Sequence, residues 1–456
     1  MQSYEGNRSL LTRYSIFFLL LAIILGTFFR ISLIVISPFV IVATCLYLKL
    51  RMTNSLLFLL LLITVSLLLS FFNGLFLKYK LLSLYNMLPF IVLLFADPKN
   101  RSDDQANVVS QLFKCLSLVA FINDIVGFVQ LINNPDIDDS FFGIYSKFSV
   151  SLNGLVLFNA ILFFYYFCLF LYDKKSRHIV YSLFFLGSSI MGFYGAGLIV
   201  VVIAFILVFF KPTLKAVIRT LSITVVSIFI IYYLLLYFKP NVLDYNLSNI
   251  KKIAKFDNQN GPRKVVSFYN YGISYPHDLK DFLFGSGPGT FNSRSAFIVG
   301  SPTFFDAATI LKSEAKPYYF KNFAYTLWNS NNTSQLLYQD GFRNQPFSSL
   351  LTFLGEYGLI FTICFFMLFY DFYKKATVRS HGENERLISA YVRIFKFLSI
   401  LLILLLCIDN FFEYPEIIVL ILTSMKVLQI EISKLNFQHA DKAPDIIKHS
   451  SHEKFQ

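Results

Sequence analysis

The sequence predicts an all-α, polytopic membrane protein with about twelve transmembrane helices and one large loop on the outer side. Three observations support this fold class. The 456 residues are 56% hydrophobic and only 15% charged, whereas soluble domains average about 25% charged residues. Apolar runs long enough to cross a bilayer, about 20 residues, recur through most of the chain. One connection between them is much longer than all the others.

The apolar runs define twelve candidate spans. They lie at approximately 14–29, 31–48, 55–72, 81–96, 108–132, 149–172, 178–192, 194–210, 216–238, 347–370, 391–408 and 416–430. The stretch 178–210 is divided at Gly192-Phe-Tyr-Gly195 because an undivided helix would exceed the bilayer and glycines suit a turn. The first span follows Arg8 and Arg13 without a small-x-small cleavage site, which predicts a signal anchor.

The short connections fix the predicted orientation through their positive charges. With a cytoplasmic N-terminus, the inner connections carry 16 Lys and Arg residues and the short outer ones carry 4, as the positive-inside rule requires. The sequence therefore predicts that both termini are cytoplasmic. The net charge of +13 then reflects anchoring at the inner leaflet, with no nucleic-acid partner. Four regions result: helices 1–9 over 1–238, a loop over 239–346, helices 10–12 over 347–430, and a cytoplasmic tail over 431–456.

The long outer loop is expected to carry the function. It has about 108 residues, with twelve Lys and Arg against seven Asp and Glu. Loops of this length are usually functional or disordered, and the many aromatic residues argue against disorder. The five cysteines are scattered through apolar stretches with no paired spacing, so we expect no metal site and no cofactor.

Two motifs in this loop bear on chemistry. Arg263 and Lys264 precede an amphipathic stretch, Val265–Tyr275, which predicts a short helix. The run Gly285-Ser-Gly287-Pro-Gly289 follows and predicts a tight turn whose amide groups can approach an anion. The alternative is a plain surface turn. A dinucleotide site is rejected because the run does not lie between a strand and a helix.

A third motif ends the loop, where a helix enters the membrane with Glu356 in its first turns. A carboxylate at that depth is costly and is a candidate functional group. The alternative is a packing residue that is hydrogen-bonded to a neighbouring segment. Asp124, inside the span at 108–132, raises the same two alternatives.

Together these motifs resemble the superfamily of O-antigen polymerases and O-antigen ligases. The shared features are a loop arginine before an amphipathic helix, the run Phe284-Gly-Ser-Gly-Pro-Gly-Thr-Phe291, and the re-entering segment around Glu356. The resemblance implies a bacterial inner-membrane glycosyltransferase. Its substrates are oligosaccharides on undecaprenyl pyrophosphate, and its implied surroundings are membrane lipid and a chain-length regulator. The polymerase transfers the growing glycan to a hydroxyl of the next lipid-linked repeat.

The resemblance also implies roles for individual residues. A pyrophosphate leaving group requires charge neutralisation, which guanidinium groups provide without a metal. Arg263 matches the loop arginine of the superfamily best, and Arg294 and Arg343 are further candidates by position. Gly285, Gly287 and Gly289 are expected to approach the pyrophosphate.

The general base is left open. His277 is the only histidine predicted to face outward, and its imidazole could take the acceptor proton. The alternative is a polar residue that precedes a helix, and Asp278 and Asp281 are weaker candidates for the base.

Two other functions remain as alternatives to the polymerase. An O-antigen ligase transfers the glycan to a lipid A-core acceptor, but its loop-end histidine is replaced here by Phe347. A lipid-linked oligosaccharide flippase would show two similar halves, and no internal repeat is visible. The sequence does not identify the sugars or the kind of polysaccharide.

Overall fold

The chain folds as a helical membrane protein. The computed structural model describes residues 30–98, 108–133, 141, 143, 151–192, 194–210, scattered positions from 222 to 251, 261–275, 278–304, 309–328, 345–377 and 385–452. Across these residues the structure is almost entirely helical, and one two-stranded antiparallel pair, β1 with β2, joins two inter-helix connections.

The described elements fall into three parts of the chain. The first part contains α2 (Arg30–Tyr47), β1 (Leu50–Arg51), α3 (Asn54–Ser70), η1 (Phe71–Asn73), α4 (Leu77–Phe95), β2 (Asp97–Pro98), α5 (Val108–Asn133), α6 (Ser151–Asp173), α7 (Ser176–Met191) and α8 (Gly195–Phe209). The middle part contains α11 (Arg263–Ile273), α12 (Leu279–Phe284), α13 (Arg294–Gly300), η2 (Thr309–Leu311), η3 (Phe320–Ala324) and η4 (Tyr325–Trp328). The last part contains α16 (Ser349–Thr352), η5 (Phe353–Tyr357), α17 (Gly358–Thr377), α18 (Glu385–Ile408), η6 (Phe411–Glu413) and α19 (Pro415–His452).

Six helical segments are long and apolar enough to cross a bilayer. They are 54–73, 77–95, 108–133, 154–173, 349–377 and 386–408. Only 28% of the apolar window in the first of these is buried inside the protein. Its outward face carries large apolar side chains such as Leu57 and Leu61, a surface that suits lipid rather than water. These segments establish a membrane protein.

Most helix boundaries agree with the sequence prediction. The predicted break inside 178–210 is confirmed, because α7 ends at Met191 and α8 begins at Gly195. The candidate span at 14–29 lies outside the described residues, and the one at 216–238 is described only at scattered positions. The total of twelve spans therefore stays a prediction.

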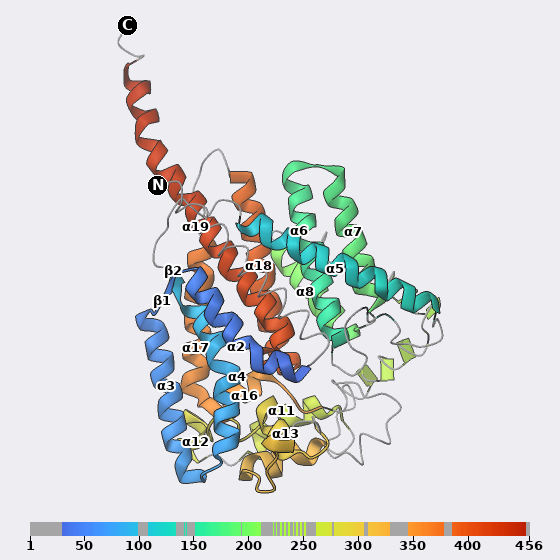
Figure 1. Ribbon diagram of the computed structural model, residues 1–456, viewed down its shortest axis with the longest axis vertical. Coiled ribbons are helices and arrows are strands. Elements are labelled where there is room, and N and C mark those ends of the chain that lie inside the picture. The colour runs from blue at the N-terminus through green and yellow to red at the C-terminus, as the bar shows by residue number, and fades with distance from the viewer. Residues whose placement is uncertain are drawn as a thin grey trace.

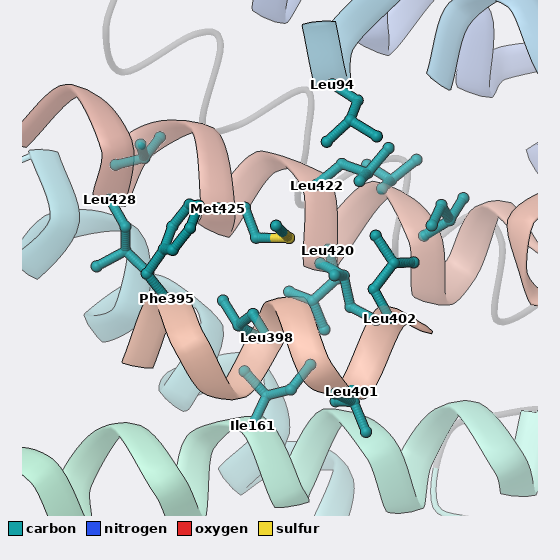
Figure 2. Close-up of a cluster of buried hydrophobic side chains, with 14 of the residues drawn as sticks. Leu94, Ile161, Phe395, Leu398, Leu401, Leu402, Leu420, Leu422, Met425 and Leu428 are labelled. Carbon is teal, nitrogen blue, oxygen red and sulfur yellow. The ribbon is translucent and has the colours of Figure 1, made fainter. Parts of the chain in front are cut away.

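The core lies where α18 packs against α19 on one side and α6 on the other. Figure 2 shows Leu398 and Leu402 of α18 facing Leu420 and Met425 of α19. Toward α6, the rings of Phe397 and Phe164 are stacked with their centroids 4.0 Å apart. Aliphatic and aromatic side chains fill these contacts, and this close packing holds helices together in a medium as apolar as they are.

The middle part of the chain forms a separate layer at one end of the helices (Figure 1). We call residues 261–275, 278–304 and 309–328 the folded loop. Its helices α11, α12 and α13 gather beside the lower ends of α3 and α4, whereas the C-terminal end of α19 lies at the opposite end of the molecule (Figure 1). This arrangement fits a loop on one side of the membrane and a C-terminal tail on the other.

Two lysines on α4 tie the folded loop and the α3–α4 turn in place. The ammonium group of Lys78 donates to the carbonyl oxygens of Ile310 and Lys312, each at 3.1 Å. Lys80 is buried and donates to the carbonyls of Ser70 (3.0 Å) and Gly74 (2.8 Å). The charge count predicts that these lysines lie on the outer side, and in the structure both bind backbone carbonyls.

The two ends of the molecule can be assigned to sides of the membrane by labelling. Ile310 in the folded loop is 88% exposed, and the Lys175 side chain, between α6 and α7, is 57% exposed. In a variant without the five native cysteines, we expect Ile310→Cys to react with an impermeant maleimide in spheroplasts. Lys175→Cys should react only after lysis. Reaction of both cysteines from the same side would contradict this topology.

Candidate functional site

The carboxylate of Glu356 is enclosed by backbone amide groups of the turn between α12 and α13. Its Oε1 accepts hydrogen bonds from the amides of Phe291 (3.0 Å) and Ser293 (2.9 Å). Its Oε2 accepts one from the amide of Gly289 (2.5 Å). The side chain is fully buried, and the three hydrogen bonds from backbone amides compensate for its loss of water. Glu356 thus fastens the glycine-rich turn to the start of a membrane-crossing helix.

The three alternate glycines are required by this close approach. Gly285, Gly287 and Gly289 have φ angles of +82°, +109° and +73°, a region that L-residues with a side chain rarely adopt. A Cβ atom would overlap the Glu356 carbonyl at Gly285, the Ser70 side chain at Gly287 and the Tyr79 carbonyl at Gly289. The tight turn predicted from the sequence is therefore present, packed against the ends of α3, α4 and η5.

The amides of these glycines serve the protein itself. Gly285 donates to the Asp281 carbonyl (2.9 Å), Gly287 to the Glu356 carbonyl (3.0 Å) and Gly289 to the Glu356 carboxylate. The expectation that this turn binds a pyrophosphate through its amides needs correction, because these amides already donate to acceptors inside the protein. Glu356 was itself a catalytic candidate, and its carboxylate is engaged in these hydrogen bonds instead.

A buried ion pair fixes the beginning of α11. The Lys264 ammonium lies 3.4 Å from the Asp409 carboxylate, and both side chains are almost completely buried. Lys264 also donates to the Ile408 carbonyl at the end of α18, where a cation offsets the partial negative charge of the helix terminus. Neither partner was assigned a role from the sequence. The pattern that could have revealed the pair is a carboxylate directly after an apolar span, at Ile408-Asp409-Asn410.

Arg294 occupies a second buried position, at the first residue of α13. It is 1% exposed, and its backbone amide donates to the Glu413 carboxylate. Its guanidinium lies 4.2 Å from the centre of the Tyr414 ring, and Nη1 is 3.4 Å from the Glu413 carbonyl oxygen. These contacts join the folded loop to the connection between α18 and α19. They place Arg294 inside the protein rather than at a ligand-accessible surface.

Arg263 differs from Arg294 in its exposure. It is the first residue of α11 and is partly exposed, directly beside the buried Lys264. The Lys264–Asp409 pair therefore holds the Arg263 backbone at the boundary between the folded loop and the membrane helices. The other two candidates, His277 and Arg343, lie outside the described residues.

Phe347, just before α16, packs into an aromatic cluster with residues of the folded loop. It is 1% exposed, and its ring packs edge-on to Phe297 at 4.4 Å and stacks with Trp328 at 5.7 Å. The resemblance stated from the sequence expects a histidine here in a ligase. A phenylalanine inside an aromatic cluster supplies no proton acceptor there.

Burial raises the pKa of the carboxyl groups that contact the two buried cations, Lys264 and Arg294. Burial raises the pKa of Glu413 to about 8, and the nearby Glu356 adds to the rise. Burial also raises the pKa of Asp409, although Lys264 opposes this effect. Near neutral pH, Glu413 is therefore largely protonated and can act as both hydrogen-bond donor and acceptor.

Comparisons with known proteins leave these residues as the main basis for a functional assignment. No protein-family model matches the chain, and no curated protein matches it. Among the described residues, no three His, Cys, Asp or Glu side chains are grouped so that they could hold a metal ion. The site can thus offer arginine and lysine charge, hydroxyl groups and aromatic rings at the end of a helical membrane bundle.

The structure of the glycine-rich turn can be tested by measuring the stability of glycine-to-alanine variants. Gly289→Ala should destabilise the protein by about 2–4 kcal/mol, because the new Cβ meets the Tyr79 carbonyl and the φ angle is positive. Gly272→Ala is the matched control, since nothing lies within 4 Å of its Cβ and the residue is helical. That control should keep or slightly raise stability. Thermal unfolding of the purified variants in detergent measures both, and equal melting temperatures would contradict the structure of the turn.

The raised pKa of Glu413 predicts a pH dependence of stability. The unfolded carboxyl group titrates near 4.5 and the folded one near 8, so the folded state binds the extra proton between these values. Stability should fall as the pH rises from about 5 to about 8. In Glu413→Gln, which retains the hydrogen-bonding shape without a titrating proton, this part of the slope should disappear. An unchanged slope in that variant would assign the pH dependence to other groups.

Proposed function

We propose that this protein is a polysaccharide polymerase that joins repeat units carried on undecaprenyl pyrophosphate. The reaction takes place at the outer face of the bacterial inner membrane, with O-antigen or capsular repeat units as substrates. The polymerase is a metal-independent glycosyltransferase and is regulated by a separate chain-length protein. This proposal combines the motif resemblance with the arrangement of charged residues at the loop end of the helices.

The observation that carries the proposal is the placement of Arg263. Lys264 anchors the first turn of α11 to Asp409 at the end of α18, and Arg263 lies beside it, partly exposed, at the level where membrane helices end. A lipid-linked pyrophosphate has its phosphates at this level. A guanidinium group binds a pyrophosphate through paired hydrogen bonds and stays charged at every relevant pH.

The proposed reaction needs little covalent help from the protein. A hydroxyl oxygen of the incoming repeat attacks the anomeric carbon of the growing chain and forms the new C–O bond. The bond between that carbon and the pyrophosphate oxygen breaks, and its electron pair leaves with undecaprenyl pyrophosphate. Arg263 stabilises the charge that develops on the leaving group. The hydroxyl proton passes to a base, for which His277 remains the candidate from the sequence.

The structure changes the roles of the other candidate residues within this proposal. Arg294 is assigned to holding α13 against Glu413, and Glu356 with the three glycines is assigned to shaping the folded loop. Arg343 remains a second candidate for the pyrophosphate. The aromatic packing of Phe347 favours the polymerase over the ligase, since it leaves the ligase histidine without a counterpart.

Deletion of the gene tests the function. We expect surface glycans one repeat long in place of a ladder, because transfer of single repeats would continue without polymerisation. Loss of all surface repeats, with long polymer retained on undecaprenyl pyrophosphate, would identify a ligase. Single repeats trapped on the cytoplasmic side would identify a flippase. Either result would overturn the proposal.

The role of Arg263 predicts a severe defect in one variant. Arg263→Ala should reduce polymer formation about 100-fold or more, as expected when a group that stabilises a leaving-group charge is removed. Lys321→Ala removes an exposed positive charge from the same folded loop and should leave the ladder intact. Immunoblots of membranes establish that both variants insert. A wild-type ladder from Arg263→Ala would refute the assignment.

A further inference from the structure

A cleft lies between the α3–α4 turn and the folded loop. Its volume is about 200 Å³. Three segments contribute to it: the end of α3 with the turn after it, the glycine-rich turn, and the residues before η3. The lining residues are Ser70, Asn73, Phe76, Ser286, Thr290, Pro317, Tyr318 and Tyr319.

The lining of this cleft is neutral, hydroxyl-rich and aromatic. Ser70, Ser286 and Thr290 contribute hydroxyl groups, Asn73 an amide, and Tyr318 and Tyr319 phenol rings. None of the described lining residues carries a charge, so a phosphate would find no cation in the wall. Hydroxyls and amides can pair with the hydroxyl groups of a polyol. Aromatic faces cover the apolar C–H face of a sugar ring, with a few polar groups fixing its orientation.

Asp281, which does not itself line the cleft, accepts hydrogen bonds from two residues that do, Asn73 and Tyr319. The Tyr319 hydroxyl donates to its Oδ2, and the Asn73 amide donates to its Oδ1 at 3.2 Å. Lys280 lies 3.3 Å from the same carboxylate and donates to the Asn73 carbonyl oxygen at 3.1 Å. Asp281 is 3% exposed and does not line the cleft, which makes it a positioning residue.

The hydrogen-bond pattern leaves acceptor capacity for a ligand. Burial and the hydrogen bond to Asp281 raise the pKa of Tyr319, so its hydroxyl keeps its proton and donates it to Asp281. The phenol oxygen can then accept a hydrogen bond from the cleft.

Hydrogen bonds also fix the opposite wall of the cleft, which the glycine-rich turn forms. The Ser286 and Thr290 hydroxyls are 2.7 Å apart, and Ser286 donates to the Gly355 carbonyl at 3.0 Å. Gly287 allows this turn to lie directly against Ser70. Binding to walls fixed in this way costs little ordering of side chains.

The turn that carries Asn73 also exposes large apolar side chains. Phe72 is 81% exposed and Leu75 is 80% exposed, at the junction of two membrane-crossing segments. Large apolar side chains at that level suit contact with lipid. The cleft therefore lies where a sugar attached to a membrane lipid would be found.

We infer that this cleft is a sugar-binding subsite that holds one pyranose ring of the lipid-linked glycan, at a distance from its pyrophosphate. The inference rests on the proposed function for the source of the sugar, whereas the cleft chemistry alone indicates a neutral polyol. In this arrangement, Tyr318 and Tyr319 cover the ring, and the side-chain oxygens of Asn73 and Thr290, whose donors are used inside the protein, accept hydrogen bonds from its hydroxyl groups.

Direct binding tests the subsite without requiring the reaction. The full-length protein in nanodiscs of phosphatidylethanolamine and phosphatidylglycerol is mixed with methyl glycosides of neutral hexoses, deoxyhexoses and N-acetylhexosamines. Saturation-transfer NMR reports which ring protons contact the protein. We expect transfer to at least one of these glycosides, and an excess of inorganic pyrophosphate should leave it unchanged.

Variants then locate the contact. Tyr318 is 59% exposed, so Tyr318→Ala removes a ring with little effect on folding. It should weaken binding about fivefold or more, the usual effect of losing one aromatic contact. Asp281→Asn should weaken binding as well, through Tyr319 and Asn73. Tyr269→Ala is the control, because Tyr269 is a partly exposed tyrosine of the folded loop that does not line the cleft.

The outcomes separate the subsite from the proposed function. Absence of transfer to every glycoside, displacement by pyrophosphate, or wild-type affinity in Tyr318→Ala would overturn the subsite. Such a result would leave the polymerase intact if gene deletion still removes the ladder. Glycoside binding that depends on Tyr318, together with an unchanged ladder after deletion, would retain the sugar site and overturn the polymerase.

Discussion

The hydrogen bonds between the Glu356 carboxylate and the amides of Gly289, Phe291 and Ser293 are the constraint on which the rest of this structure depends. They join a membrane-crossing helix to a turn of the folded loop. A buried carboxylate with fewer donors would carry a large desolvation cost. The glycine-rich turn connects α12, which carries Asp281, to α13, which begins with Arg294. Both the cleft and the contact with Glu413 therefore depend on the Glu356 side chain.

Much of the positive charge of the folded loop is structural. Lys312 binds the carbonyls of Ile298 and Ser301, and Lys78 of α4 binds the loop carbonyls of Ile310 and Lys312. Lys264 is enclosed with Asp409. An ammonium group with three donors suits such clusters of carbonyls, since each donor can be satisfied inside the protein. The basic composition of the loop therefore overstates the number of cations available to a ligand.

The two proposed recognition elements bind chemically different parts of an amphiphilic substrate. Arg263 offers charge to a pyrophosphate, and the cleft beside Tyr318 offers hydroxyls and rings to a neutral sugar. The elements that carry them, α11 and the folded loop with the α3–α4 turn, lie at the end of the molecule opposite the C-terminal end of α19 (Figure 1). The exposed Phe72 and Leu75 between membrane helices suit the lipid part. A site divided in this way can bind each part of a lipid-linked glycan with a different set of residues.

The sequence by itself determined the membrane class, most helix boundaries and the tight glycine turn, because apolar run length and glycine spacing are local properties of the chain. The break between Met191 and Gly195 and the helix at α11 follow from such local patterns. Only the tertiary structure decided which groups meet. Glu356 lies 67 residues after Gly289, and Asn73 lies 208 residues before Asp281, so no local pattern reveals either contact. The use of the turn amides by an internal carboxylate, and the cleft that results, required the folded chain.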